Sequence, residues 1–167
     1  VGTTLGMGGV RLWNPETQEE MFLDPVSKRT ARVKKEFGVS YMEMLSEGVP
    51  YMGNTIDVLV RVSVFTGHRE AKVEAFALSQ EPVFFLTGIN YHEKTETKQT
   101  DNYICTWGVH PEDVAAKQMN IGGSIIFNPD HFKSMAKGEN QFELVSKPTK
   151  YLSYWVTSAC EKEKEIN

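Results

Sequence analysis

Histidines that stand beside arginine or tyrosine are the residues of this chain best suited to chemistry. His68 is followed by Arg69, which places a titratable imidazole next to a fixed cation that could hold a carboxylate. Tyr91 and His92 are adjacent and could supply an acid and a base for proton abstraction beside a carbonyl. Trp107 could offer an aromatic face to a sugar ring. These residues predict a surface for a carboxylate-bearing sugar, with catalytic candidates His92, Tyr91 and His68 and binding candidates Arg69 and Trp107.

Arg61 joins the binding candidates, because an arginine could neutralise the carboxylate of an acidic sugar. It lies in the middle of a predicted strand, whereas His68 lies at the turn that follows. At about 3.3 Å per residue the two are roughly 20 Å apart, so we do not expect them to hold one ligand atom together. Each candidate also has an ordinary alternative. A turn histidine is usually just exposed, Tyr91 and His92 suit a solvated loop, and Trp107 suits a core position.

Familiar metal and cofactor motifs do not account for these residues. His110, Glu112 and Asp113 could ligate a divalent metal, but this spacing is common where a helix begins, and we predict no metal site. The sequence has no Cys-x-x-Cys pair and no Gly-x-Ser-x-Gly elbow. The glycine-rich residues 6–9 precede a predicted strand, so they lack the helix dipole that holds a phosphate. Any chemistry must come from residues that converge from separate strands, and the sequence names no cofactor.

The elements that must position these residues are β-strands, above all the two predicted within residues 55–78 and joined by a turn at residues 66–69. Small and β-branched residues alternate there with polar and aromatic ones, which is typical of strands with one face on a core. The opposite face mixes charges with aromatic rings. It suits either the concave face of a curved sheet, where sugars often bind, or an ordinary solvent face. We expect burial of Ile56, Val58, Val60, Val62 and Val64.

The rest of the chain predicts more strands, separated by turn signals about every ten residues. Many short strands of this kind predict an all-β fold, an antiparallel β-sandwich, as a single domain over residues 1–167. Residues 47–54 and 90–102 are predicted as loops, and two short helices are predicted at residues 111–119 and 130–136. The further strands are predicted at residues 9–13, 29–35, 37–46, 83–89, 103–107, 123–127, 141–146 and 151–159.

Composition excludes some partners. The chain has 167 residues and a net charge of −4, with no basic tract beyond residues 28–35, which argues against a nucleic-acid partner. No apolar run is long enough to span a bilayer. Cys105 and Cys160 are expected to be buried free thiols, with a single disulfide as the alternative. Because the chain opens at Val1 directly into strand-like sequence, we expect a fragment of a longer protein whose signal peptide is not included.

A resemblance to a known family runs through residues 8–13, Arg61, residues 66–69, residues 86–89 and residues 107–108. In these stretches the chain is similar to the C-terminal half of a bacterial family, the domain-of-unknown-function family 4861. The Gly-His-Arg turn between two long strands is the most specific element. The resemblance implies a galactose-mutarotase-like β-sandwich whose concave sheet binds carbohydrate. Its matching positions are Arg61, His68, Arg69 and Trp107, whereas His92 and His110 have no clear counterpart.

The resemblance also implies a function. Family members tend to be exported proteins of bacteria that digest plant or algal polysaccharides, often alongside pectin-degrading enzymes. We therefore expect a periplasmic or secreted lyase or hydrolase whose partner is a uronic-acid-containing oligo- or polysaccharide. The alternative is a non-catalytic carbohydrate-binding or structural module. Members are about twice this length, so an N-terminal half or a second chain is expected to complete a larger sandwich.

Two structural features separate these functions. An enzyme predicts acidic or basic groups with shifted pKa values that converge in one cleft. A binding module predicts a flat aromatic platform without such a cluster. The fold alone does not choose, because sandwich folds serve both.

Overall fold

Two antiparallel sheets make up the described part of the chain, which in this computed structural model comprises residues 4–24, 27–109 and 118–163. The larger sheet has eight strands in the order β3-β4-β5-β6-β13-β10-β9-β8, and the smaller has five in the order β11-β12-β7-β1-β2. The predicted all-β, antiparallel sandwich is confirmed. The strands are β1 (Arg11–Asn14), β2 (Glu19–Met21), β3 (Lys28–Glu36), β4 (Val39–Tyr51), β5 (Asn54–Phe65), β6 (Ala71–Leu78), β7 (Phe85–Asn90), β8 (Glu96–Gln99), β9 (Tyr103–Val109), β10 (Asn120–Ile126), β11 (Phe132–Lys137), β12 (Gln141–Ser146) and β13 (Tyr151–Cys160).

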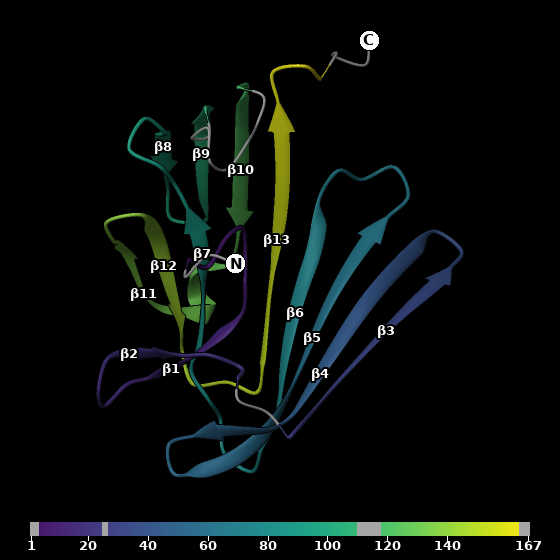
Figure 1. Ribbon diagram of the computed structural model, residues 1–167, viewed down its shortest axis with the longest axis vertical. Helices are drawn as coiled ribbons and strands as arrows, with labels where there is room; N and C mark the ends of the chain where they lie inside the picture. Colours follow the sequence, from purple (N-terminus) through teal and green to yellow (C-terminus); the bar gives the residue numbers. More distant parts are fainter. Residues whose placement is uncertain (1–3, 25–26, 110–117, 164–167) are drawn as a thin grey trace.

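The core lies between the two sheets. Val58, Ala75 and Leu152 of the larger sheet are buried in one cluster with Phe85 and Phe142 of the smaller sheet. We call this side of the larger sheet its inner face and the opposite side its outer face. The smaller sheet covers the inner face only in part, because β3, β4, β5 and β6 fan away from it (Figure 1). As a result, β3 is exposed along its whole length.

The hairpin of β5 and β6 forms as predicted, and its strands pair from Asp57 with Leu78 to Val64 with Ala71. The predicted burial of its valines is only partly correct. Val58 is 0% exposed, whereas Val64 on the same face is 51% exposed. The alternation places both side chains on the inner face, but the smaller sheet does not extend as far as Val64.

Several segments differ from the sequence predictions, among them the short strand β2, which was not predicted. The helix predicted at residues 130–136 is wrong: a single 3-10 turn, Pro129–His131, leads into β11, because Met135 and its neighbours pair with β12. Residues 47–51 and 54 belong to β4 and β5, which continue past a bulge between Ser46 and Val49. The predicted loop 90–102 contains β8, a polar strand at the edge of the larger sheet. The helix predicted at residues 111–119 lies largely outside the described residues.

The glycine-rich N-terminal segment is structural. Gly8 has a φ of 72°, in the region that favours glycine, and its carbonyl accepts a hydrogen bond from the hydroxyl of buried Tyr154 at 2.7 Å. A Cβ on Gly8 would lie 2.5 Å from Val156 Cγ1, so only glycine fits against the inner face of β13. Burial raises the pKa of Tyr154.

The two cysteines are free and partly exposed rather than buried. Cys105 pairs with Ser124 on the outer face, and Cys160 pairs with Ile121 on the inner face. Because their side chains lie on opposite faces of one sheet, the alternative of a disulfide does not fit this structure. No helix of the described residues is long and apolar enough to cross a membrane.

Candidate functional site

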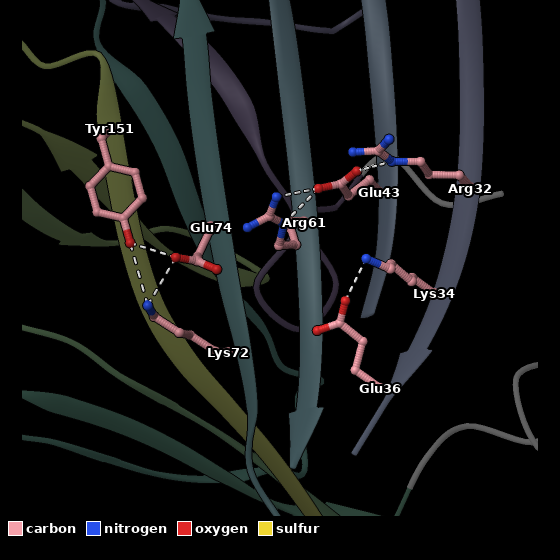
Figure 2. Close-up of polar contacts among 8 residues, drawn as sticks. All are labelled: Arg32, Lys34, Glu36, Glu43, Arg61, Lys72, Glu74 and Tyr151. Atoms are coloured by element: carbon pink, nitrogen blue, oxygen red, sulfur yellow. Dashed lines mark hydrogen bonds and ion pairs between the residues drawn. The ribbon is translucent and has the colours of Figure 1, made fainter. Parts of the chain in front are cut away.

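The outer face of the larger sheet carries a row of alternating charges. Strand pairing sets Arg32, Glu43, Arg61, Glu74 and Ser153 side by side across β3, β4, β5, β6 and β13. Figure 2 shows these charged side chains turned toward one another. Adjacent, opposite charges on one face stabilise cross-strand pairing. The row therefore organises the outer face, and Arg61 is its central cation.

Glu43 is the shared partner in this row. Arg32 binds its Oε2, and Arg61 binds its Oε1 through Nε at 2.6 Å and also through Nη2. The two guanidinium groups leave the Glu43 side chain only 2% exposed. Hydrogen bonds from Arg32, and then from Arg61, outweigh the opposing effect of burial and lower the pKa of Glu43. Glu43 is therefore ionised at neutral pH.

Arg61 lies between two aromatic rings. Its guanidinium carbon is 5.0 Å from the centroid of Tyr41 and 5.8 Å from that of Phe76, within cation–π range. Only its Nε and Nη2 contact Glu43, and an arginine has five N–H donors. Arg61 thus has donors to spare for a ligand, although its charge already has a carboxylate partner.

Lys72, Glu74 and Tyr151 form a second polar cluster beside Arg61 (Figure 2). The Tyr151 hydroxyl donates to Glu74 at 2.6 Å, and Lys72 Nζ donates to Glu74 at 2.9 Å and to Tyr151 at 3.4 Å. Burial raises the pKa of Glu74, but the hydrogen bonds from Tyr151 and Lys72 together outweigh it, and the pKa is lowered. The hydrogen bond to Glu74 raises the pKa of Lys72. Both groups are charged at neutral pH.

Trp107 lies at the other end of the outer face, over β10. A Cβ on Gly122 would be 2.5 Å from the indole Cε3, so the glycine lets the ring rest against the strand backbone. Trp107 is nevertheless 38% exposed and lines a shallow, mostly apolar groove of about 330 Å³ with Arg69, Cys105 and Thr157. The buried Oγ1 of Thr157 has no hydrogen-bond partner among the described residues. An indole backed by glycine at the wall of an open groove can stack on a flat ligand face.

The predicted turn residues lie near this groove. Arg69 contributes to its lining and forms an ion pair with Glu163. His68 is exposed at the tip of the hairpin, 3.8 Å from Glu70, and its ring packs edge-on against Phe65 with centroids 6.1 Å apart. The structure thus places Arg69 and Trp107 in the lining of one groove, and His68 does not line it.

Tyr91 and His92 lie elsewhere. Tyr91 follows β7 of the smaller sheet, packs on Phe142 and donates its hydroxyl to the carbonyl of Gly138. The His92 backbone is held to Thr95, in a loop that packs on the inner face of β9 at Gly108. The larger sheet therefore separates this pair from Arg61 and Trp107.

No metal centre is present among the described residues, in which no three His, Cys, Asp or Glu side chains are placed to hold an ion. His110, Glu112 and Asp113 lie outside the described residues. Another groove, of about 870 Å³, lies near the opposite end of the hairpin between residues 51–56 and 78–83. Glu81 is its single charged lining residue, and the groove contains none of the predicted site residues.

Sequence reasoning missed the partners of Arg61 and the aromatic side chains of β13. Glu43 and Glu74 are linked to Arg61 only by strand register, which one sequence does not reveal. Tyr151 and Trp155 carried a readable signal, because they alternate with the buried residues of one predicted strand.

Comparisons with known proteins bear on family only. No curated protein matches the chain. The profile described as "Domain of unknown function (DUF4861)" matches residues 1–167. Because this match covers the whole chain, the protein belongs to the DUF4861 family.

Proposed function

We propose that the outer face of the eight-stranded sheet binds carbohydrate and that Trp107 is its stacking platform. The observation that carries the proposal is the indole itself, which rests against Gly122 and remains 38% exposed in an open groove. Sugar rings present an apolar face that an aromatic ring can cover. Arg69 also lines the groove and supplies a cation near the indole ring.

The charges on this face favour binding over catalysis. A general acid at neutral pH needs a raised carboxyl pKa, but the pKa values of Glu43 and Glu74 are both lowered. Both carboxylates form ion pairs within the sheet, Glu43 with Arg32 and Arg61, and Glu74 with Lys72. The candidate pair Tyr91 and His92 does not reach the outer face. We therefore rank a non-catalytic carbohydrate-binding module first.

The ligand class and location follow from the family resemblance and remain proposals. We propose an acidic plant or algal polysaccharide as the ligand and the periplasm or the cell exterior as the location. The resemblance implies a galactose-mutarotase-like sandwich, which would bind sugar on one face of a large sheet. We propose that the outer face of this protein is the corresponding surface.

The test is affinity electrophoresis through gels that contain single acidic or neutral polysaccharides. We expect retardation in at least one acidic gel and its loss in Trp107→Ala. Val109→Ala is the matched control, because Val109 lies on the same strand and face and is equally exposed. Both variants should keep the melting temperature of the wild type within a few degrees. Equal retardation of Trp107→Ala and the wild type would place the site elsewhere.

A lyase or hydrolase is the second candidate, and the Lys72, Glu74 and Tyr151 cluster favours it. A tyrosine hydroxyl held between a carboxylate and an ammonium could move a proton at a bound sugar. The test is prolonged incubation with the polysaccharides that bind, followed by assays for unsaturated ends and for new reducing ends. Product that forms with the wild type and not with Tyr151→Phe would establish catalysis. If the wild type forms no product, the binding module remains the proposed function.

A further polypeptide layer is proposed on a separate observation. Val33, Met42 and Val64 lie at neighbouring positions on the inner face of β3, β4 and β5, and all three are exposed. Contiguous exposed apolar surface of this kind marks interaction sites. An N-terminal half or a second chain would continue the sandwich over this part of the sheet.

A further inference from the structure

We propose that the ligand is an extended acidic chain that lies along β13, from Trp107 past Trp155 to Tyr151. This inference rests on the proposed function and specifies its ligand. Mono- and disaccharides would fill only the groove at Trp107. A longer chain would reach aromatic and cationic side chains along most of the outer face.

The alternation of β13 aligns the aromatic residues. Tyr151 pairs with Phe76 and Trp155 pairs with Lys72, and both positions lie on the outer face. Further along, Ala159 pairs with Gly122, and Gly122 pairs with Trp107. Trp107 therefore continues the line of β13 side chains across β10. In Figure 1, β13 runs through the middle of the larger sheet, from its lower end toward the C-terminus.

The spacing requires a long ligand. Tyr151 and Trp155 are four residues apart, about 13 Å at about 3.3 Å per residue. Trp107 lies level with Ala159 and two strands away, which places it roughly 28 Å from Tyr151 at about 4.8 Å per strand. A chain that engages both ends gains affinity through effective concentration rather than through stronger single contacts.

Cations lie beside the aromatic side chains, which favours an acidic chain. Lys72 pairs with Trp155 in register and contacts the Tyr151 hydroxyl, and Arg69 lines the groove with Trp107. Each cation has a carboxylate partner, but lysine has three donors and arginine five, more than one carboxylate uses. Arg61 likewise lies next to an aromatic ring, that of Phe76. The ring centroids of Phe76 and Tyr151 are 5.0 Å apart. Repeated carboxylates along a uronic-acid chain would meet these donors in turn.

The test is calorimetric titration with oligogalacturonides from dimer to octamer and with uncharged cello-oligosaccharides of the same lengths. For the wild type we expect affinity for the acidic series to rise at least about tenfold from dimer to octamer, and weaker binding of the neutral series. Tyr151→Ala should lower octamer affinity about tenfold and leave dimer affinity unchanged. Trp107→Ala should weaken both. Tyr151→Phe, which keeps the ring, should restore octamer affinity, and Ser153→Ala, on the same face between the two aromatic residues, is the matched control.

The outcomes distinguish the extended site, the acidic ligand class and the proposed function from one another. Acidic oligosaccharides that bind with the same affinity at every length, or a Tyr151→Ala effect equal for dimer and octamer, would overturn the extended site and leave the proposed function standing. Equal or tighter binding of the neutral series would overturn the acidic class. A wild type that binds neither the oligosaccharides nor any polysaccharide gel would overturn the proposed function and this inference with it.

Discussion

The two ends of β5 carry the same pattern of residues and have opposite environments. Val58 and Val64 lie on the same inner face, yet Val58 is fully buried and Val64 is half exposed. At Val58 the smaller sheet covers the larger one, and at Val64 it does not. Period-two alternation thus specifies the face on which a side chain lies but not whether another layer covers that face. In this sheet, a side chain on the inner face is buried only where the smaller sheet covers it.

The alternating residues on the outer face of the same strand make polar and aromatic contacts instead of entering a core. Arg61 and Phe65 alternate with the valines, and Arg61 is satisfied by Glu43 rather than by water alone. On this face the interactions are cross-strand ion pairs and ring contacts. On the inner face they are apolar contacts with another sheet. Substitutions can break these contacts one region at a time.

The largest effect is expected from a charge series along the inner face. Val58→Asp should destabilise the protein by about 4 kcal/mol or prevent folding, because an unpaired carboxylate would enter a dry core. Val60→Asp, at a partly buried position packed on that core, should cost about 2 kcal/mol. Val64→Asp should cost less than about 0.5 kcal/mol. Urea unfolding of the three variants measures the order.

The order itself is the critical outcome of that series. All three substitutions are chemically identical, so β-propensity and charge are matched and only the covering layer differs. If Val64→Asp is as damaging as Val58→Asp, the inner face is covered along the whole strand.

A smaller effect is expected from Glu43→Gln on the outer face. The pKa of Glu43 is lowered in the folded state, so its stabilising effect is present above its unfolded pKa of about 4.3 and is lost as pH falls through the folded value. We expect Glu43→Gln to cost on the order of 1 kcal/mol at pH 7, since solvent screens the ion pair with Arg32, whose side chain is largely exposed. The difference from wild type should shrink toward zero as pH falls below about 5. Urea unfolding at several pH values measures it. A pH-independent difference would mean that Glu43 acts through packing alone.

Local patterns predicted the fold class, the β5–β6 hairpin and the face of Arg61, because each depends on residues close in sequence. The local pattern of β11 predicts a helix, and only the pairing of Met135 and its neighbours with β12 makes it a strand. The pattern of β8 predicts a loop, because a polar edge strand has no apolar alternation. The approach of Arg69 to Trp107 depends on sheet order and could not be read from sequence.

The smallest effect is expected where the inner face is uncovered. Met42→Thr should change the unfolding free energy of the isolated chain by less than about 0.5 kcal/mol, because Met42 is exposed and has no second layer to lose. Leu144→Thr, fully buried in the smaller sheet, is the contrasting control and should cost several times more. Light scattering of the wild type distinguishes the possible partners. A monomer would agree with a layer that a different polypeptide supplies. A dimer that Met42→Thr dissociates would show instead that a second copy of this chain covers the face, and a monomer strongly destabilised by Met42→Thr would contradict the exposed position altogether.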